Sequence, residues 1–319
     1  MIDFRYHLVS IIAVFLALAV GIVVGTTALN GGIVDTLKSS NSKIIKDKRN
    51  LEGTVRDLRS SVGRRDDFTE TVAPRIVAGR LVNERVLFVA APNASDGTLK
   101  QLEAMVTQAG GTPTGVLRLR GDLLDPDKNQ VIDDLVAQVA PAGVTLPEGA
   151  PSDSAAVELA AALVAKSGAA ALGEDAAAKV LGGFTGADLV QWQAPAGQKS
   201  PATEPATMAV VVTGGSDGKP LDDAGQQQQR AVLTLARALD DRSQGVVVAG
   251  PVSSAGQGGL LQALRDDNGL RDQVSSVDVA DTPYGQVTVV LALDEQETGG
   301  SGRYGEGPGA EAAAPSPPS

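Results

Sequence analysis

The side chains that could bind a soft metal ion are few and far apart in this sequence. There is no cysteine, the one histidine is His7 near the N-terminus, and the three methionines are Met1, Met105 and Met208. Soft ions such as Cu(I) prefer thiolates, thioethers and imidazoles, and these residues form no cluster along the chain. We expect His7 to be an interfacial residue, and Met105 and Met208 to fill the apolar core. No metal-binding residue is therefore assigned.

Carboxylates gather at three places where they could attract a hard cation. These groups are Asp122/Asp125/Asp127, Asp222/Asp223 and Asp266/Asp267. Each group also suits helix capping and solvated surface, which is the reading we favour. A Ser–His–Asp triad would need a histidine in the globular part of the chain, and none occurs there. We expect no enzyme, no catalytic residues and no bound cofactor.

Three turns that follow apolar strands could offer backbone N–H groups to an anion. They are "AAPNASDG" at 90–97, "TGGSDG" at 213–218 and "AGPVSSAGQGG" at 249–259. In α/β proteins such turns meet at the carboxyl ends of parallel strands, where ligands bind. None has the G-x-G-x-x-G spacing of a dinucleotide site. Ordinary turns and helix caps are the favoured interpretation, with an α/β enzyme or small-ligand sensor as the weakest functional alternative.

An almost unbroken apolar run of 22 residues extends from Leu8 to Leu29. As a helix it would be about 33 Å long, enough to cross a hydrocarbon core of about 30 Å. A cleavable signal has a shorter apolar region behind a more basic start. We predict a transmembrane anchor over 1–30, with a cleaved signal or a buried core helix as the alternatives.

Small residues recur every fourth position along this run. They are Ala13, Ala17, Gly21 and Gly25, which share one helix face. Such faces let two membrane helices pack closely, so we predict that this face mediates self-association.

A heptad pattern follows the apolar run. The a positions are Val34, Asn41, Lys48, Val55 and Val62, and the d positions are Leu37, Ile44, Leu51 and Leu58. Valine at a with leucine at d favours two parallel strands, and a polar a residue specifies register. We predict a parallel coiled-coil homodimer over 31–72. The alternative is one amphipathic helix packed on its own domain.

A charged segment over 64–79 that contains Pro74 is expected to be a hinge. Beyond it, apolar strands such as "VLFVAAP", "MAVVVTGG" and "GVVVAGP" alternate with helical stretches. This alternation predicts a Rossmann-like α/β domain with a mainly parallel sheet over 82–297. The segment Tyr284–Gln296 fits either a helix or a strand. The Gly/Pro/Ser/Ala-rich tail over 298–319 is expected to be disordered.

The formal net charge of −11 opposes nucleic-acid binding, which needs clustered Lys and Arg. Aromatic residues make up only 3% of the chain, so the core must be built from Ala, Val and Leu.

The opening "MIDFRYHLVSIIAVFLALAVGIVVG", the heptads, the "VLFVAAP" strand and the late "DTPYGQVTVVLAL" together resemble the actinobacterial copper transport protein B family, the mycobacterial copper-transporter group. The resemblance spans nearly the whole chain. It implies a membrane-associated envelope protein of copper efflux or resistance, with copper as the transported ion. Related corynebacterial proteins act in cell separation with a membrane partner, which implies an envelope protein partner.

Basic residues after the span would by themselves place the large domain in the cytoplasm. They are Lys38, Lys43, Lys46, Lys48 and Arg49, against Arg5 before the span. All five lie in the heptad helix, and the family resemblance implies the opposite side. We expect an extracytoplasmic domain. Two functions stay open: a copper-transport or copper-homeostasis component, and a dimeric scaffold for an envelope partner that does not itself bind copper.

Overall fold

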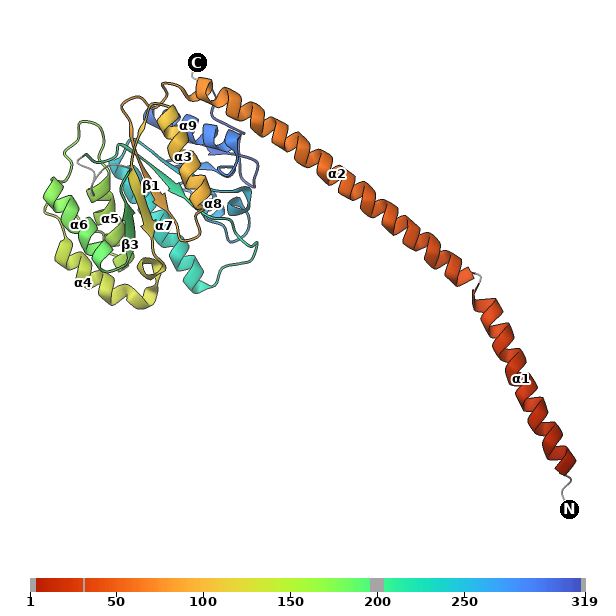
Figure 1. Ribbon diagram of the computed structural model, residues 1–319. Coiled ribbons are helices and arrows are strands. Elements are labelled where there is room, and N and C mark those ends of the chain that lie inside the picture. The colour runs from red at the N-terminus through yellow and green to blue at the C-terminus, as the bar shows by residue number, and fades with distance from the viewer. Residues whose placement is uncertain (1–3, 31, 196–203, 317–319) are drawn as a thin grey trace. The chain divides into compact units, whose positions relative to one another are not determined.

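The computed structural model describes residues 4–30, 32–195 and 204–316, and the chain divides into two compact units, Met1–Arg65 and Asp66–Ser319 (Figure 1). The first unit is helical wherever it is described. The second unit contains the sheet and the helices that cover it.

Two long helices form the N-terminal part of the chain. Helix α1 covers Phe4–Asn30 and helix α2 covers Gly32–Val77. Within α1, the segment Arg5–Thr26 reaches a mean hydropathy of 2.9, and none of that apolar window is buried by other parts of the structure. Helix α1 is thus long and apolar enough to cross a membrane, which agrees with the single span predicted from the apolar run.

The hinge expected over 64–79 is wrong, because α2 continues as a helix to Val77 with Pro74 inside it. Proline removes a backbone hydrogen bond and costs about 3 kcal/mol inside a helix. The flanking Ala73 and Val77 are fully buried in the core of the second unit, and this burial offsets the cost. The helix is followed by a turn in which Gly79 has a φ of 77°, a conformation that favours glycine.

One sheet of seven strands organises the described part of the second unit, in the order β3-β2-β1-β4-β5-β6-β7. The strands are β1 Arg85–Ala90, β2 Thr112–Leu119, β3 Val190–Gln193, β4 Met208–Val212, β5 Val246–Ala249, β6 Ser275–Val277 and β7 Arg303–Tyr304. All neighbours are parallel except β2 and β3. The predicted α/β class with a mainly parallel sheet is confirmed, and the narrower Rossmann-like assignment stays a prediction.

Helices cover both faces of this sheet. They are α3 Asp96–Gln108, α4 Asn129–Val139, α5 Pro151–Leu163, α6 Glu174–Gly186, α7 Asp223–Arg242, α8 Leu260–Asp266 and α9 Pro283–Glu297, with the short 3-10 helices η1 Gly121–Leu124, η2 Pro126–Lys128 and η3 Val252–Ala255. One apolar cluster joins the sheet to α4 through α8, and a second joins it to α3, α9 and the end of α2.

Alternation along the strands explains why both clusters are filled. Val89 and Val211 face the first cluster, whereas Phe88 and Val210 face the second. A strand that is covered on both faces needs apolar residues at every position, which is the pattern read from the sequence.

The segment Tyr284–Gln296, which fitted helix or strand, is part of helix α9. Thr282 caps its start, since its Oγ1 accepts a hydrogen bond from the backbone N–H of Gly285 at 3.2 Å and donates to the carbonyl of Val279 at 2.7 Å. Pro283 occupies the first turn, where a missing N–H is harmless. Most of α9 is buried, so its sequence lacks the one-sided period of a surface helix.

Strand β3 was not anticipated, because its four residues alternate polar and apolar side chains too briefly to show a pattern. It lies antiparallel at the edge of the sheet, where Trp192 packs against β2. Gly115 of β2 has a φ of 143°, and a Cβ on it would overlap the ring of Trp192. Glycine is required at this position for both reasons.

The disordered tail expected over 298–319 is not what the structure shows. Residues up to 316 are described, and β7 pairs in parallel with β6. The physical cause is a buried ion pair of 2.8 Å between Arg265 and Asp278, whose side chains are 3% and 0% exposed. Asp278 Oδ1 accepts hydrogen bonds from the backbone N–H groups of Glu306 at 2.8 Å and Gly307 at 3.0 Å.

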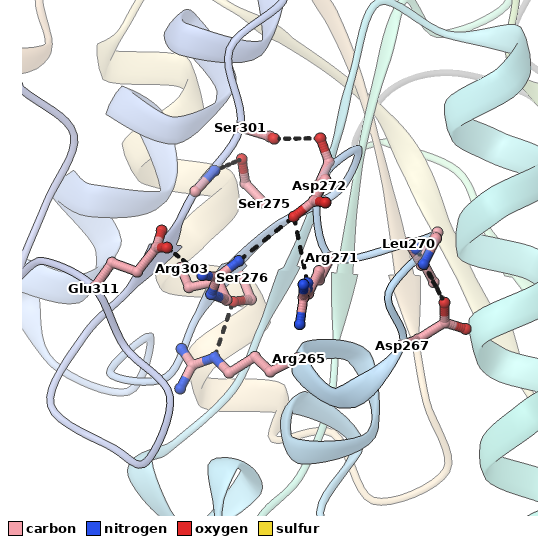
Figure 2. A network of polar contacts seen from close by, with 12 residues as sticks. Arg265, Asp267, Leu270, Arg271, Asp272, Ser275, Ser276, Ser301, Arg303 and Glu311 are labelled. Atoms are coloured by element: carbon pink, nitrogen blue, oxygen red, sulfur yellow. Dashed lines mark hydrogen bonds and ion pairs between the residues drawn. The ribbon is translucent and has the colours of Figure 1, made fainter.

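Arg265 holds the same tail from the other side of the ion pair. Its Nη1 donates to the carbonyl of Pro308 at 2.7 Å and its Nη2 to the carbonyl of Tyr304 at 3.1 Å. Figure 2 shows its Nε directed at Ser276 of β6, a hydrogen bond of 3.1 Å. In the same view Arg303 of β7 reaches both Asp272 and Glu311. A tail of low-complexity composition is therefore ordered by charged groups from earlier elements.

Candidate functional site

The small-residue face predicted for the membrane span lies on α1. Ala13, Ala17 and Gly21 are exposed, and a Cβ placed on Gly21 or Gly25 would meet no atom within 4 Å. The face is therefore open in the described helix, as a packing surface must be. Self-association through it stays a prediction.

The heptad residues lie on α2 and present an apolar stripe. The four d-position residues are 61–66% exposed, and they are Leu37, Ile44, Leu51 and Leu58. At the a positions, Val55 and Val62 are exposed, as are Asn41 and Lys48, and the side chain of Val34 lies outside the described residues. Apolar side chains that are exposed at regular spacing along a helix would gain hydrophobic free energy if a partner covered them. The coiled-coil homodimer stays a prediction.

The three strand-to-helix turns singled out from the sequence come together at one place. The sheet grows from β1 toward β3 on one side and from β4 toward β7 on the other, so β1 and β4 flank its topological switch point. A cleft of about 150 Å³ lies there, and residues from all three turns line it. This volume is below the range of about 300–1,000 Å³ that is usual for small-molecule sites.

Packing between the turns accounts for their glycines. A Cβ on Gly214 would overlap the backbone oxygen of Asn93, and a Cβ on Gly259 would overlap that of Ser254. Ser95 caps α3, with its Oγ accepting from the N–H of Thr98 at 3.4 Å. Close backbone approach and capping thus explain these residues, in line with the interpretation favoured from the sequence.

The candidate soft-metal ligands are not brought together. Met105 and Met208 are 8% and 0% exposed and belong to the apolar cluster under α3 and α9, so the prediction that they fill the core is confirmed. His7 is exposed near the start of α1. Among the residues that the structure describes, no group of three His, Asp or Glu side chains is placed to hold a metal ion.

The carboxylate groups noted in the sequence are used locally. Asp122 forms an ion pair of 3.7 Å with Lys128, and Asp125 accepts from the backbone N–H of Asp127. Asp222 is the N-cap of α7. Asp267 Oδ1 accepts two backbone N–H groups of the turn that follows it. These contacts agree with the capping role expected for such residues.

An unusual carboxylate lies in the core of the second unit. Glu158 of α5 is 0% exposed, and within the described structure neither carboxylate oxygen has a hydrogen-bond partner. Burial raises the pKa of Glu158 from 4.5 to about 7, and the nearby Lys179 lowers it only in part. The ammonium of Lys179 donates to the carbonyl of Gln138 at 2.8 Å and is therefore engaged at the end of α4.

Glu158 should make the fold less stable as the pH rises. Its folded-state pKa exceeds its ordinary value, so the folded protein holds the proton more tightly between pH 4.5 and about 7. The free energy of unfolding should fall across this window by about 3 kcal/mol and then level off. Glu158→Gln should remove this loss, so that the variant is more stable than the wild type at pH 8 and similar to it at pH 4.

Urea unfolding at several pH values measures the effect. Burial raises the pKa of Asp240 to about 6, so this residue also lowers the free energy of unfolding as the pH rises. Its contribution is the same in both proteins and cancels in the comparison. The exposed Glu148 offers a matched control, since Glu148→Gln should leave the pH profile unchanged. Equal profiles for wild type and Glu158→Gln would show that folding does not raise the pKa of Glu158, and would contradict the prediction.

Comparison with known proteins shows that one family contains the apolar helix, the heptad helix and the α/β domain in a single chain. The family model described as "Copper transport outer membrane protein, MctB" matches residues 1–315. The "Copper transporter MctB" of Mycobacterium tuberculosis (strain H37Rv) is 31% identical over 97% of this chain and 98% of its own length. The protein of the same name from Mycobacterium leprae is 28% identical over the same shares.

This chain belongs to the MctB family. The match takes in the apolar helix, the heptad helix, the sheet and the tail as far as residue 315. The resemblance drawn from the opening motif and the late "DTPYG" segment is confirmed, and a copper transport-related role is supported. Membership of the MctB family does not by itself say which residues would contact the ion.

Proposed function

We propose that this chain is a membrane-anchored, dimeric envelope protein of copper homeostasis that presents its α/β domain to a protein partner. Helix α1 anchors it, the heptad part of α2 joins two chains, and the domain supplies the surface that the partner recognises. Copper is the ion whose transport it serves, and we propose that this chain does not bind it directly.

The exposed apolar residues at the d positions of α2 are the observation that carries this proposal. Four large apolar side chains at heptad spacing on one helix fit a second copy of the same helix, because an a/d stripe matches the narrow seam of a coiled coil. The small-residue face of α1 supports the same two-fold association in the membrane.

The chemistry of the available side chains supports the second half of the proposal. The α/β domain has no cysteine or histidine, and its two methionines are buried among apolar residues. A thioether that is enclosed by aliphatic side chains has no second soft ligand beside it, so it would bind Cu(I) weakly.

The protein should therefore bind Cu(I) no tighter than micromolar, about −8 kcal/mol. A competition titration of the full chain against a Cu(I) chelator under reducing conditions measures this affinity. A stoichiometric nanomolar site would contradict the proposal of a scaffold that does not bind copper. It would favour direct copper handling, the function that the names of the mycobacterial relatives suggest. Replacing Met105 and Met208 with leucine should leave the weak binding unchanged.

We also propose that the α/β domain lies outside the cytoplasm. Protease added to intact spheroplasts should then digest residues beyond Gly79 and leave α1 protected. Full protection of the domain, with digestion only after the membrane is permeabilised, would place it in the cytoplasm, as the basic residues after the span would suggest.

A further inference from the structure

A pocket of about 420 Å³ lies in the second unit, between α7, the start of α5 and the short helices η1 and η2. Its volume falls in the range of about 300–1,000 Å³ that is usual for small-molecule sites. It shares only Leu124 with the smaller cleft at the switch point. Neither the heptad part of α2 nor the copper role proposed above uses this pocket.

The pocket combines an apolar floor with a polar wall. Its floor is made of buried leucines, which are Leu123, Leu124, Leu233 and Leu270. Its wall is one face of α7, because the polar residues recur at helical spacing: Gln227, Arg230, Thr234 and Arg237. A ligand lying here would touch leucine on one side and hydrogen-bond donors on the other.

Arg230 is an exposed cation of this wall whose terminal nitrogens have no partner among the described protein groups. Its Nε donates to the carbonyl of Gln226 in the same helix at 3.3 Å. In the described parts of the chain, neither of its terminal nitrogens has a hydrogen-bond partner and no carboxylate lies at ion-pair distance. A guanidinium whose terminal nitrogens are free presents a fork that matches a carboxylate, sulfonate or phosphate group.

The carboxylates around the pocket are already engaged. Asp125, Asp153 and Asp267 each accept a backbone N–H of their own turn, at 3.0, 3.2 and 2.8 Å. Arg237 lies 3.6 Å from Asp267, a loose ion pair that leaves other donors of the guanidinium available. Two guanidinium groups and three carboxylates line the pocket, so the free donors rather than net charge select the ligand.

We propose that this pocket binds a small amphipathic organic anion. Its acidic group accepts hydrogen bonds from Arg230, and its apolar body lies on the leucine floor. Thr234 and Arg237 supply further donors for a second polar group. A neutral molecule of the same shape binds less well, because it cannot form charge-assisted hydrogen bonds with the guanidinium of Arg230.

Naphthalene-2-sulfonate is a suitable probe, and its binding to the full chain in lipid nanodiscs can be measured by equilibrium dialysis, with empty nanodiscs subtracted. We expect one saturable site per chain. Arg230→Gln should weaken binding at least about tenfold, since a charge-assisted hydrogen bond is lost. The matched control is Arg242→Gln, on the same helix and outside the pocket, which should bind like the wild type. The neutral 2-naphthol should bind more weakly than the sulfonate.

Ala231→Phe provides a second test that leaves the charge intact, because the ring would fill the pocket from α7. It should abolish binding while the thermal unfolding transition is kept. No saturable binding to the wild type, or unchanged affinity in both Arg230→Gln and Ala231→Phe, would overturn the site. Nanodiscs rich in an anionic lipid distinguish two sources of the ligand: competition with the probe indicates a lipid-derived anion, and no competition indicates a free organic acid.

Discussion

Replacing Arg265 with methionine should lower the free energy of unfolding by about 3–5 kcal/mol, because Asp278 would keep a buried charge with no cation beside it. The carbonyls of Tyr304 and Pro308 would also lose their donor. Methionine approximates the volume of the arginine stem, so the loss reports mainly the charge and hydrogen bonds. The tail should then detach from β6.

Urea unfolding of Arg265→Met gives the stability, and limited trypsin digestion reports the tail. Cleavage after Arg303 should be fast in the variant and slow in the wild type, where β7 is paired. Arg271→Met is the matched control, since its ion pair with Asp272 is partly exposed and should be worth under about 1 kcal/mol. A similar small loss in both variants would mean that the buried pair does not hold the tail.

Replacing Leu51 and Leu58 together with aspartate should convert the proposed dimer to a monomer. Each substitution places a carboxylate in the d layer of the proposed seam, and the partner chain brings a second one opposite it. Burying these charges, or leaving the seam open, costs several kcal/mol per dimer. Analytical ultracentrifugation of a chain that begins at residue 31 measures the effect without the membrane helix, because the heptads alone should support pairing.

A matched control adds the same two charges to the outer face of the helix. Asn50 and Ser60 fall at c and f positions of the heptad, so Asn50→Asp/Ser60→Asp should remain dimeric. If the Leu51/Leu58 variant still sediments as a dimer, the two chains meet elsewhere. If the wild-type chain without its span is monomeric, the heptads do not form the contact.

The local residue pattern was enough to predict those helices and strands in which every residue has the same environment. The apolar run predicted α1, and runs such as Met208–Val212 and Val246–Ala249 predicted strands covered on both faces. These predictions succeed because a membrane or two helix layers impose one environment on every residue of the segment. Strand β3 was missed because it pairs only with β2 at the edge of the sheet, and only its Trp192 is packed closely against that strand.

Residue order alone was sufficient to predict the apolar span, the heptad stripe, the mainly parallel α/β class and the scarcity of soft metal ligands. Each of these is a property of residue type and spacing along a short segment. The order of the tail could be recognised only in the folded protein, since Arg265 and Asp278 are 13 positions apart and reach the tail from α8 and from the end of β6. Likewise, Glu158 is the one charged residue of the apolar stretch 155–165, but only the packing shows that its carboxylate is enclosed, and nothing near Arg230 marks it as unpaired. Burial and pairing of a charge depend on which distant elements close over it, and that is settled by packing rather than by the chain's local pattern.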